Sequence, residues 1–184
     1  MSRMAMTLMA VCIVGAVILA FVNRVTEGPI AEEKRREVLR ALDSVLPPHT
    51  NSPDQDTREI TTDDGKVITL YLARQRDRVV GTALQVTAPD GYSGNIGVMV
   101  GVDNNGSILG VRILSHAETP GLGDKMVTDS TWLPAFRGRN LANTEWAVKK
   151  DGGDIDQFTG ATITPRAVVG AVKQGLEVCA KFCR

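Results

Sequence analysis

The stretch DQFTGATITPRAVVGAVKQG, residues 156–175, places three threonines around a Gly-Ala pair at the expected start of a helix. Thr164 followed by Pro165 predicts that start, because a hydroxyl can cap free amide groups and proline loses no hydrogen bond at the first helical position. The free N–H groups and the positive end of the helix dipole also favour a phosphate group. Two interpretations stay open from the residues alone: the threonines cap a helix, or Thr162 carries a phosphate on its side-chain oxygen.

Cysteine and histidine offer little further chemistry. The chain has three cysteines, of which Cys12 lies in an apolar run. Cys179 and Cys183 are four residues apart in a predicted helix, a spacing that puts both on one face but does not suit an unstrained disulfide. No CxxC or CxxCH pattern occurs, and no nucleophile motif flanks His49 or His116. The sequence therefore indicates no zinc, iron–sulfur or c-type haem site and no catalytic residue.

Length, charge and one apolar run limit the class of protein. The 184 residues suffice for one domain with an appendage, and the formal net charge of zero, without a basic stretch, argues against a nucleic-acid partner. Residues 4–22 carry no charge and are about as long as a helix that crosses a bilayer core. No small-x-small cleavage site precedes Arg24, so we expect a retained single-pass anchor over residues 1–24; a cleaved signal peptide is the alternative.

Lysine and arginine residues bear on the orientation of this anchor. Arg3 and the amino terminus precede the apolar run, whereas Arg24 and the basic cluster 34–36 follow it. Counted in this way, the positive-inside rule favours the cytoplasmic side for the rest of the chain.

Hydrophobic periodicity predicts the elements that must position the threonines. Apolar residues at positions 38, 39, 42, 45 and 46 predict an amphipathic helix within residues 30–46, separated from the anchor by Gly28-Pro29 and ended by Pro47-Pro48. A polar linker, 49–56, follows. From Thr57 the period changes to two, and turn signals separate expected strands at 57–62, 67–75, 78–88, 95–103 and 107–114.

Neighbouring strands of this kind predict a mainly antiparallel sheet rather than a βαβ fold. After the sheet we expect a short helix over 126–136, a strand over 144–149 and a last helix over 164–182. The buried stripe of the last helix is predicted to comprise Val168, Val169, Val172, Leu176 and Cys179. The fold class is therefore α+β: an N-terminal transmembrane helix, then a mainly antiparallel sheet flanked by helices.

The segment Asp156-x-x-Thr159-Gly160-Ala161-Thr162 resembles the flavinylation motif D-x-x-[S/T]-G-A-T of FMN-binding domains. In that family the last threonine takes FMN through a phosphoester bond, which a separate flavin transferase installs from FAD. The resemblance implies that Thr162 is the attachment site. It also implies that Thr159, Gly160 and Ala161 form the recognised turn, and that Asp156 is the acidic position of the motif.

Residues 91–125 resemble the central sheet of the same family and the loop after it. The ETPGLG element of this loop, 118–123, corresponds to the flavin-pocket loop, and its cofactor-binding residues would be Glu118, Thr119, Leu122 and Gly123. The last three would line the isoalloxazine ring: glycine permits close backbone approach, and leucine can cover a flat apolar face. An ordinary surface loop is the alternative. Tyr92 and Trp132 could stack on a flavin, although a single aromatic residue near a loop is more often packing.

With the N-terminal anchor, these blocks resemble the G subunit of the Rnf ion-translocating electron transport complex. The resemblance covers the anchor, the following helix and roughly residues 91–175. We therefore expect a transmembrane anchor (1–24), an amphipathic helix and linker (25–56) and an FMN-binding domain (57–184). The resemblance further implies a single-pass protein of a bacterial inner membrane with its flavin domain on the periplasmic side, against the charge count. The protein would relay electrons between ferredoxin and NAD within a complex of other membrane subunits, and would not be a catalyst alone.

Three alternatives remain from the sequence. The equivalent FMN subunit of the sodium-pumping NADH:quinone reductase shares both motifs but is usually longer. A membrane-tethered flavin-binding regulatory domain would share the cofactor without the electron relay. A membrane-tethered assembly domain would use the threonines of residues 156–175 for helix capping alone.

Overall fold

The computed structural model describes residues 2–62, 65 and 67–183, and the chain divides into two compact units, Met1–Glu37 and Val38–Arg184. The first unit consists of most of helix α1, Ser2–Val45. The most apolar 18-residue window of α1 has a mean hydropathy of 2.7, and none of it is buried. A helix this long and apolar is able to cross a membrane, as the sequence predicts.

The predicted break at Gly28-Pro29 is wrong, because α1 continues through both residues. A proline inside a helix removes one backbone hydrogen bond and crowds the preceding turn, but the helical periodicity resumes directly after it. Both residues are exposed, so no backbone group that loses its hydrogen bond here is buried in the protein. The helix ends at Val45, before Pro47 and Pro48, where the sequence predicts its end.

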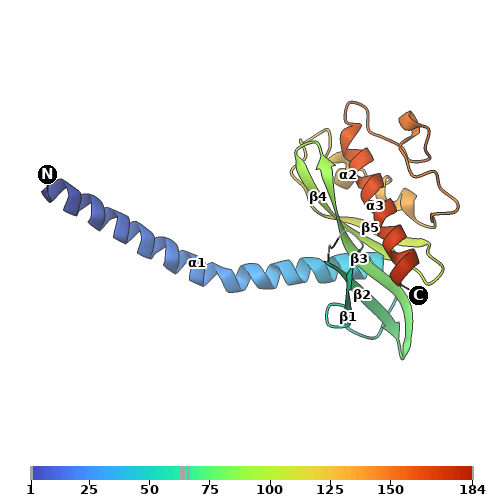
Figure 1. Ribbon diagram of the computed structural model, residues 1–184, viewed down its shortest axis with the longest axis horizontal. Helices are drawn as coiled ribbons and strands as arrows, with labels where there is room; N and C mark the ends of the chain where they lie inside the picture. The colour runs from blue at the N-terminus through green and yellow to red at the C-terminus, as the bar shows by residue number, and fades with distance from the viewer. Residues whose placement is uncertain (1, 63–64, 66, 184) are drawn as a thin grey trace. The chain divides into compact units, whose positions relative to one another are not determined.

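The second unit contains one antiparallel sheet whose strands follow each other in chain order (Figure 1). Its strands are β1 (Thr57–Thr61), β2 (Val67–Gln75), β3 (Arg78–Gly91), β4 (Gly94–Val102) and β5 (Ile108–Ser115). The predicted turn between β1 and β2 includes residues 63, 64 and 66, which lie outside the described residues. The mainly antiparallel sheet is confirmed.

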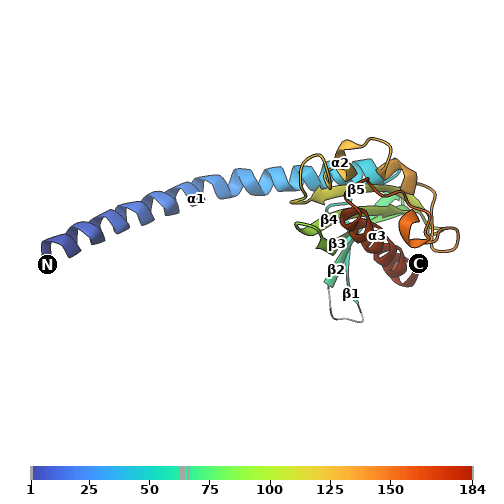
Figure 2. The same cartoon turned by 90° about the horizontal axis from the view of Figure 1, so that it is seen from above.

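Helix α3, Ile163–Phe182, crosses one face of this sheet (Figures 1 and 2). Gly175 faces the sheet, since a Cβ there would come within 3.5 Å of Val86 and 3.6 Å of Val100. The predicted apolar stripe of the helix is buried against the sheet: Val168, Val169, Val172, Leu176 and Cys179. This burial fixes the rotation of α3 about its axis and therefore the position of its first turn.

The opposite face of the sheet is covered by the last turns of α1. A Cβ on Gly101 would lie 2.0 Å from the carbonyl oxygen of Val45, and one on Gly110 would lie 3.1 Å from its Cα. The backbone of α1 therefore sits directly on the sheet at positions where only glycine fits. The side chains of this second core cluster are Ala41, Leu42, Val45, Leu46, Ala73, Ala83 and Met99.

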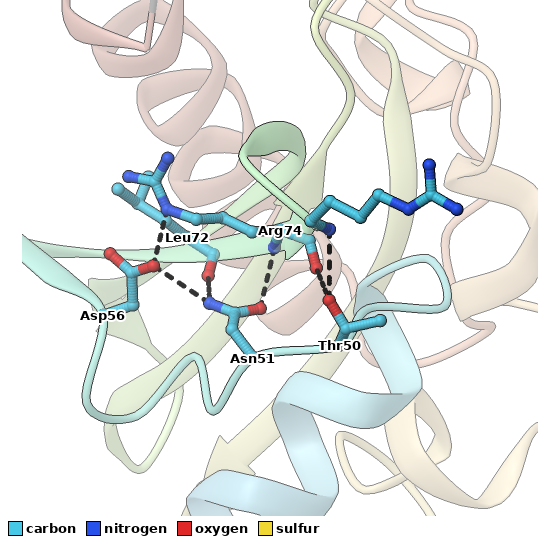
Figure 3. Close-up of polar contacts among 6 residues, drawn as sticks. Thr50, Asn51, Asp56, Leu72 and Arg74 are labelled. Atoms are coloured by element: carbon cyan, nitrogen blue, oxygen red, sulfur yellow. Dashed lines mark hydrogen bonds and ion pairs between the residues drawn. The ribbon is translucent and has the colours of Figure 1, made fainter.

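The linker after α1 is held along β2 by side-chain hydrogen bonds (Figure 3). The Asn51 amide donates to the Leu72 carbonyl at 2.8 Å and to Asp56 Oδ2 at 3.0 Å, and its oxygen accepts the Arg74 N–H at 2.7 Å. Arg74 Nε lies 2.6 Å from the same Asp56 oxygen. The Thr50 hydroxyl donates to the Arg74 carbonyl at 3.2 Å. We refer to Thr50, Asn51, Asp56 and Arg74 as the linker clamp.

The helix predicted over 126–136 is wrong in extent. The chain instead forms α2, Lys125–Thr128, and a 3₁₀ turn η1, Leu133–Phe136. Asp129 ends α2 because its carboxylate accepts the N–H and hydroxyl of Thr131 at 2.9 and 2.7 Å. Trp132 and Phe136 are both buried, with ring centroids 5.2 Å apart in an edge-to-face arrangement.

The strand predicted over 144–149 is also wrong. Within this segment, the β-bridge that the structure describes is the isolated one between Val148 and Ile155, which belongs to no strand of the sheet. The segment enters the 3₁₀ turn η2, Lys149–Asp151, instead. Val148 and Ile155 are buried, so the apolar residues pack into the core without a neighbouring strand to pair with.

Candidate functional site

Two segments far apart in the sequence meet at one pocket of about 590 Å³. One is the loop between β5 and α2, and the other is the turn that leads into α3. The residues that line the pocket are Tyr92, Glu118, Thr119, Leu122, Gly123, Lys150, Gly160, Ala161, Thr162, Ile163 and Thr164. Seven of the nine sequence-predicted site residues are therefore brought together, and the volume falls in the range of small-molecule sites.

The turn before α3 is built on a glycine and an aromatic anchor. Gly160 has φ 81°, a left-handed conformation that favours glycine. The Ala161 N–H donates to the Phe158 carbonyl at 3.1 Å, and the buried Phe158 ring packs 5.0 Å from Trp132. A Cβ on Gly160 would lie 3.8 Å from Leu122, so the turn touches the pocket loop directly.

Thr162 occupies the N-cap position of α3, but its side chain makes no capping hydrogen bond. The predicted cap at Thr164 is wrong: this residue lies inside the helix, is 1% exposed, and its hydroxyl donates to the Glu118 carboxylate. Neither hydroxyl therefore satisfies the helix end. Among the described residues, the Thr162 hydroxyl has no hydrogen-bond partner while it lines the pocket, which weakens the capping interpretation.

Glu118 forms a wall of the pocket through its hydrogen bonds. Its carboxylate is buried and accepts the Ser93 N–H at 3.0 Å and the Thr164 hydroxyl. Gly123 is packed against both groups, since a Cβ there would lie 2.5 Å from Glu118 Oε2 and 2.7 Å from Thr164 Oγ1. Glu118 thereby ties the β3–β4 turn, the pocket loop and the first turn of α3 together. Nothing in the sequence indicates this role, because it depends on contacts between distant segments.

Two charged side chains line the pocket: the buried Glu118 carboxylate and the Lys150 ammonium. Lys150 is the one cationic side chain that lines the pocket within the described part of the chain. Arg166 points elsewhere, with its Nη2 2.6 Å from Asp151, and this hydrogen bond holds the pKa of the Asp151 carboxyl below its usual value. Sequence reasoning missed Lys150, since no spacing links it to the threonine motif.

The pocket also exposes apolar side chains that a flat ring could cover. Tyr92 is 69% exposed, Ile163 45% and Leu122 44%. Of the two aromatic residues that could stack on a flavin, Tyr92 lines the pocket, whereas Trp132 packs in the core. A planar, largely apolar ligand would bury these side chains.

Asp156 and Thr159 lie outside this pocket. The Asp156 carboxylate pairs with Lys149 Nζ at 2.7 Å, and both side chains are more than half exposed. The Asp156 backbone carbonyl accepts the Trp132 indole N–H at 2.7 Å. Thr159 is exposed. The first half of the motif therefore faces solvent, while its second half faces the pocket.

Comparison with protein families gives the class of the second unit. Residues 91–177 match the family model of the FMN-binding domain, and residues 1–45 match that of the RnfG N-terminal region. The residues present also fit FMN: an unbonded hydroxyl, a cation and exposed apolar side chains surround a pocket of suitable size. The fold and site thus define a membrane-anchored FMN-binding protein.

Relatives that match most of this chain are G subunits of an ion-translocating oxidoreductase complex. The protein from Escherichia coli (strain K12) is 47% identical over 163 residues, which is 84% of this chain and 79% of the relative. That from Photorhabdus laumondii is 44% identical over 183 residues, 95% of this chain and 88% of the relative. That from Pseudomonas aeruginosa (strain UCBPP-PA14) is 44% identical over 186 residues, 96% and 87% respectively. The chain belongs to this family of G subunits.

Proposed function

We propose that the chain carries FMN covalently on Thr162 and relays electrons between ferredoxin and NAD within an ion-translocating membrane complex. The observation that carries the proposal is the Thr162 hydroxyl, which lines the pocket at the start of α3 and makes no capping hydrogen bond. A hydroxyl that serves neither the helix nor the core is available for a phosphoester. The names of the relatives support the complex, and nothing supports the sodium-pumping reductase or a regulatory domain.

The attachment needs a hydroxyl and an external activating enzyme. Thr162 Oγ1 would attack the flavin-side phosphorus of FAD, the bond between the two phosphates would break with AMP as the leaving group, and the hydroxyl proton would pass to the flavin transferase. No residue of this chain has to act as a base, because a metal-bound transferase supplies that function. Asp156 and Thr159 face solvent, where the transferase would read them before the pocket is filled.

The pocket residues would then hold the group in place. Lys150 and the free N–H groups at the start of α3 would offset the charge of the phosphodiester. Leu122 and Ile163 would cover apolar ring surface, while Glu118 links the pocket walls through its hydrogen bonds. FMN supplies one- and two-electron redox chemistry when bound, while the protein sets its position and surroundings. A covalent bond prevents loss of the cofactor from a pocket that is partly open.

The partners and the location follow from the same family. The other membrane subunits of the complex would be the electron partners, and the second unit would lie on the periplasmic side of a bacterial inner membrane. The count of lysine and arginine residues favours the opposite side. Cysteine accessibility at the exposed position Ser93→Cys in intact cells, with a membrane-impermeant reagent, tests this against the parent chain, which has the three native cysteines alone: labelling above that of the parent supports the periplasmic side, and added labelling only after lysis contradicts it.

In-gel fluorescence of the denatured chain, co-expressed with a flavin transferase, tests the attachment. The parent chain should fluoresce and Thr162→Ala should be dark, because the acceptor oxygen is gone. Thr128→Ala is the control: it removes an exposed threonine hydroxyl of α2 that does not line the pocket and should leave the band fluorescent. A fluorescent Thr162→Ala band, or a dark parent band with an active transferase, would overturn the proposed attachment.

A further inference from the structure

The far end of α3 carries two thiols that the proposed function does not use. Cys179 is buried, at 3% exposed, Cys183 is half-buried, and both are free. The Cys183 N–H donates to the Cys179 carbonyl at 2.9 Å, so the last helical turn is intact and both side chains lie on one face. Cys183 lies about 30 Å along the helix from Thr162, so the pair is separate from the flavin pocket.

Both thiols line a second pocket of about 480 Å³. Its other walls are the turn between β4 and β5, at 102–106, the segment 140–142, and two further residues of α3. The pocket therefore gives small solutes a route to the sulfurs from solvent, although Cys179 itself is buried. Thiols in a closed core would have no such route.

The spacing of the pair separates two kinds of thiol chemistry. Side chains at i and i+4 of a helix have Cβ atoms about 5–6 Å apart. A disulfide needs Cβ atoms about 3.5–4.5 Å apart, so an intact helix holds these sulfurs too far apart for one. A single cation between the two sulfurs spans the larger separation without unwinding the helix.

The number of ligands selects the kind of cation. Within residues 2–62, 65 and 67–183 no group of three or more His, Cys, Asp or Glu side chains is placed to hold a metal ion. Structural zinc sites use four protein ligands, and calcium or magnesium use oxygen ligands. Soft cations with a filled d shell, such as Cu(I), accept two thiolates in a linear arrangement.

We propose that Cys179 and Cys183 form a two-coordinate binding site for one soft, thiophilic cation of the Cu(I) class. Binding exchanges two thiol protons for the cation: both S–H bonds are lost, two S–Cu bonds form, two protons enter solution, and no electron is transferred. The cation would clamp the last turn of α3 onto itself.

Cu(I) titration of the full-length, flavin-free protein in detergent tests the site. The parent for this test is Cys12→Ser, which leaves Cys179 and Cys183 as the only thiols. With a colorimetric Cu(I) chelator as competitor, we expect one ion per chain and a thiolate-to-copper absorption in the ultraviolet. Adding Cys183→Ser or Cys179→Ser should weaken binding by about 100-fold, because one of two linked ligands is lost.

Other outcomes would overturn the site. One ion per two chains would show that the thiols bridge molecules, and an unchanged affinity in the Cys183→Ser variant would place the ion elsewhere. Should Cys179→Ser fail to fold, the half-buried Cys183→Ser carries the test, with circular dichroism to confirm its helix content. Flavin loading has its own fluorescence readout, so failure of this site and failure of the Thr162 attachment are distinguishable.

Discussion

The linker after α1 and the turn before α3 are both polar, irregular segments, but they use their polar side chains differently. In the linker clamp, Asn51 makes three hydrogen bonds, and Asp56 and Arg74 form an ion pair. In the turn, the Thr162 hydroxyl is unbonded among the described residues and faces a pocket. Similar polar residues thus hold the chain in place in the linker but leave a hydroxyl unbonded in the turn. The two segments differ in the hydrogen bonds that these side chains make, not in residue type.

Loss of the Glu118 carboxylate should have the largest effect on folding. Glu118→Ala leaves the buried Thr164 hydroxyl without its acceptor and removes the hydrogen bond from the Ser93 N–H, so we expect the free energy of unfolding to fall by about 2–4 kcal/mol. Denaturant unfolding of the flavin-free chain measures this. Glu177→Ala, an exposed glutamate on α3, is the control and should change stability by less than about 0.5 kcal/mol. Equal effects would mean that the pocket wall does not depend on Glu118.

The linker clamp should show the next largest effect. Asn51→Ala removes two donated hydrogen bonds and the acceptor for the Arg74 N–H, for an expected loss of about 2 kcal/mol. Asn105→Ala, in the exposed turn between β4 and β5, is the matched control, with an expected change below about 0.5 kcal/mol. A stability loss no larger than that of the control would remove the contrast between the clamp and the turn.

Thr162→Ala should change stability little although it removes the flavin. Its hydroxyl makes no capping bond, so the flavin-free variant should unfold within about 0.5 kcal/mol of the parent, whereas removal of a true cap costs about 1 kcal/mol. Unfolding of both flavin-free chains under one set of conditions decides this. A loss of about 1 kcal/mol would contradict the prediction, because the Thr162 hydroxyl would then cap the helix as well.

The smallest effect concerns the ion pair beside the pocket. The hydrogen bond from Arg166 lowers the pKa of Asp151. Its contribution to stability is therefore present above the unfolded-state pKa of the carboxyl and is lost as the pH falls through the lower folded-state value. Arg166→Gln should raise the pKa of Asp151 toward its ordinary value, measured from the pH dependence of its carboxyl carbon resonance. Lys173→Gln should leave it unchanged.

Local patterns predicted most of the fold and the half of the site that lies close together in sequence. Alternation located the strands, and the threonine motif located the turn before α3. The site predictions that were wrong or missing concern residues whose partners are distant in the sequence. Thr164 was expected to cap the helix because its hydroxyl precedes a proline, but Glu118, 46 residues away, takes that hydroxyl into the core. Lys150 was missed for the same reason, since only the folded chain brings it to the pocket.

The chain order of the sheet has a consequence for how the molecule reaches its final state. Each strand pairs with its immediate neighbour in the chain, so the sheet can close through short loops. Helix α3 is the last element, and its docking on β3 and β4 is the long-range step that completes the flavin pocket. Pulse-labelled hydrogen exchange during refolding should protect sheet amides before those of α3. The pocket around Thr162 is therefore complete only once α3 has docked.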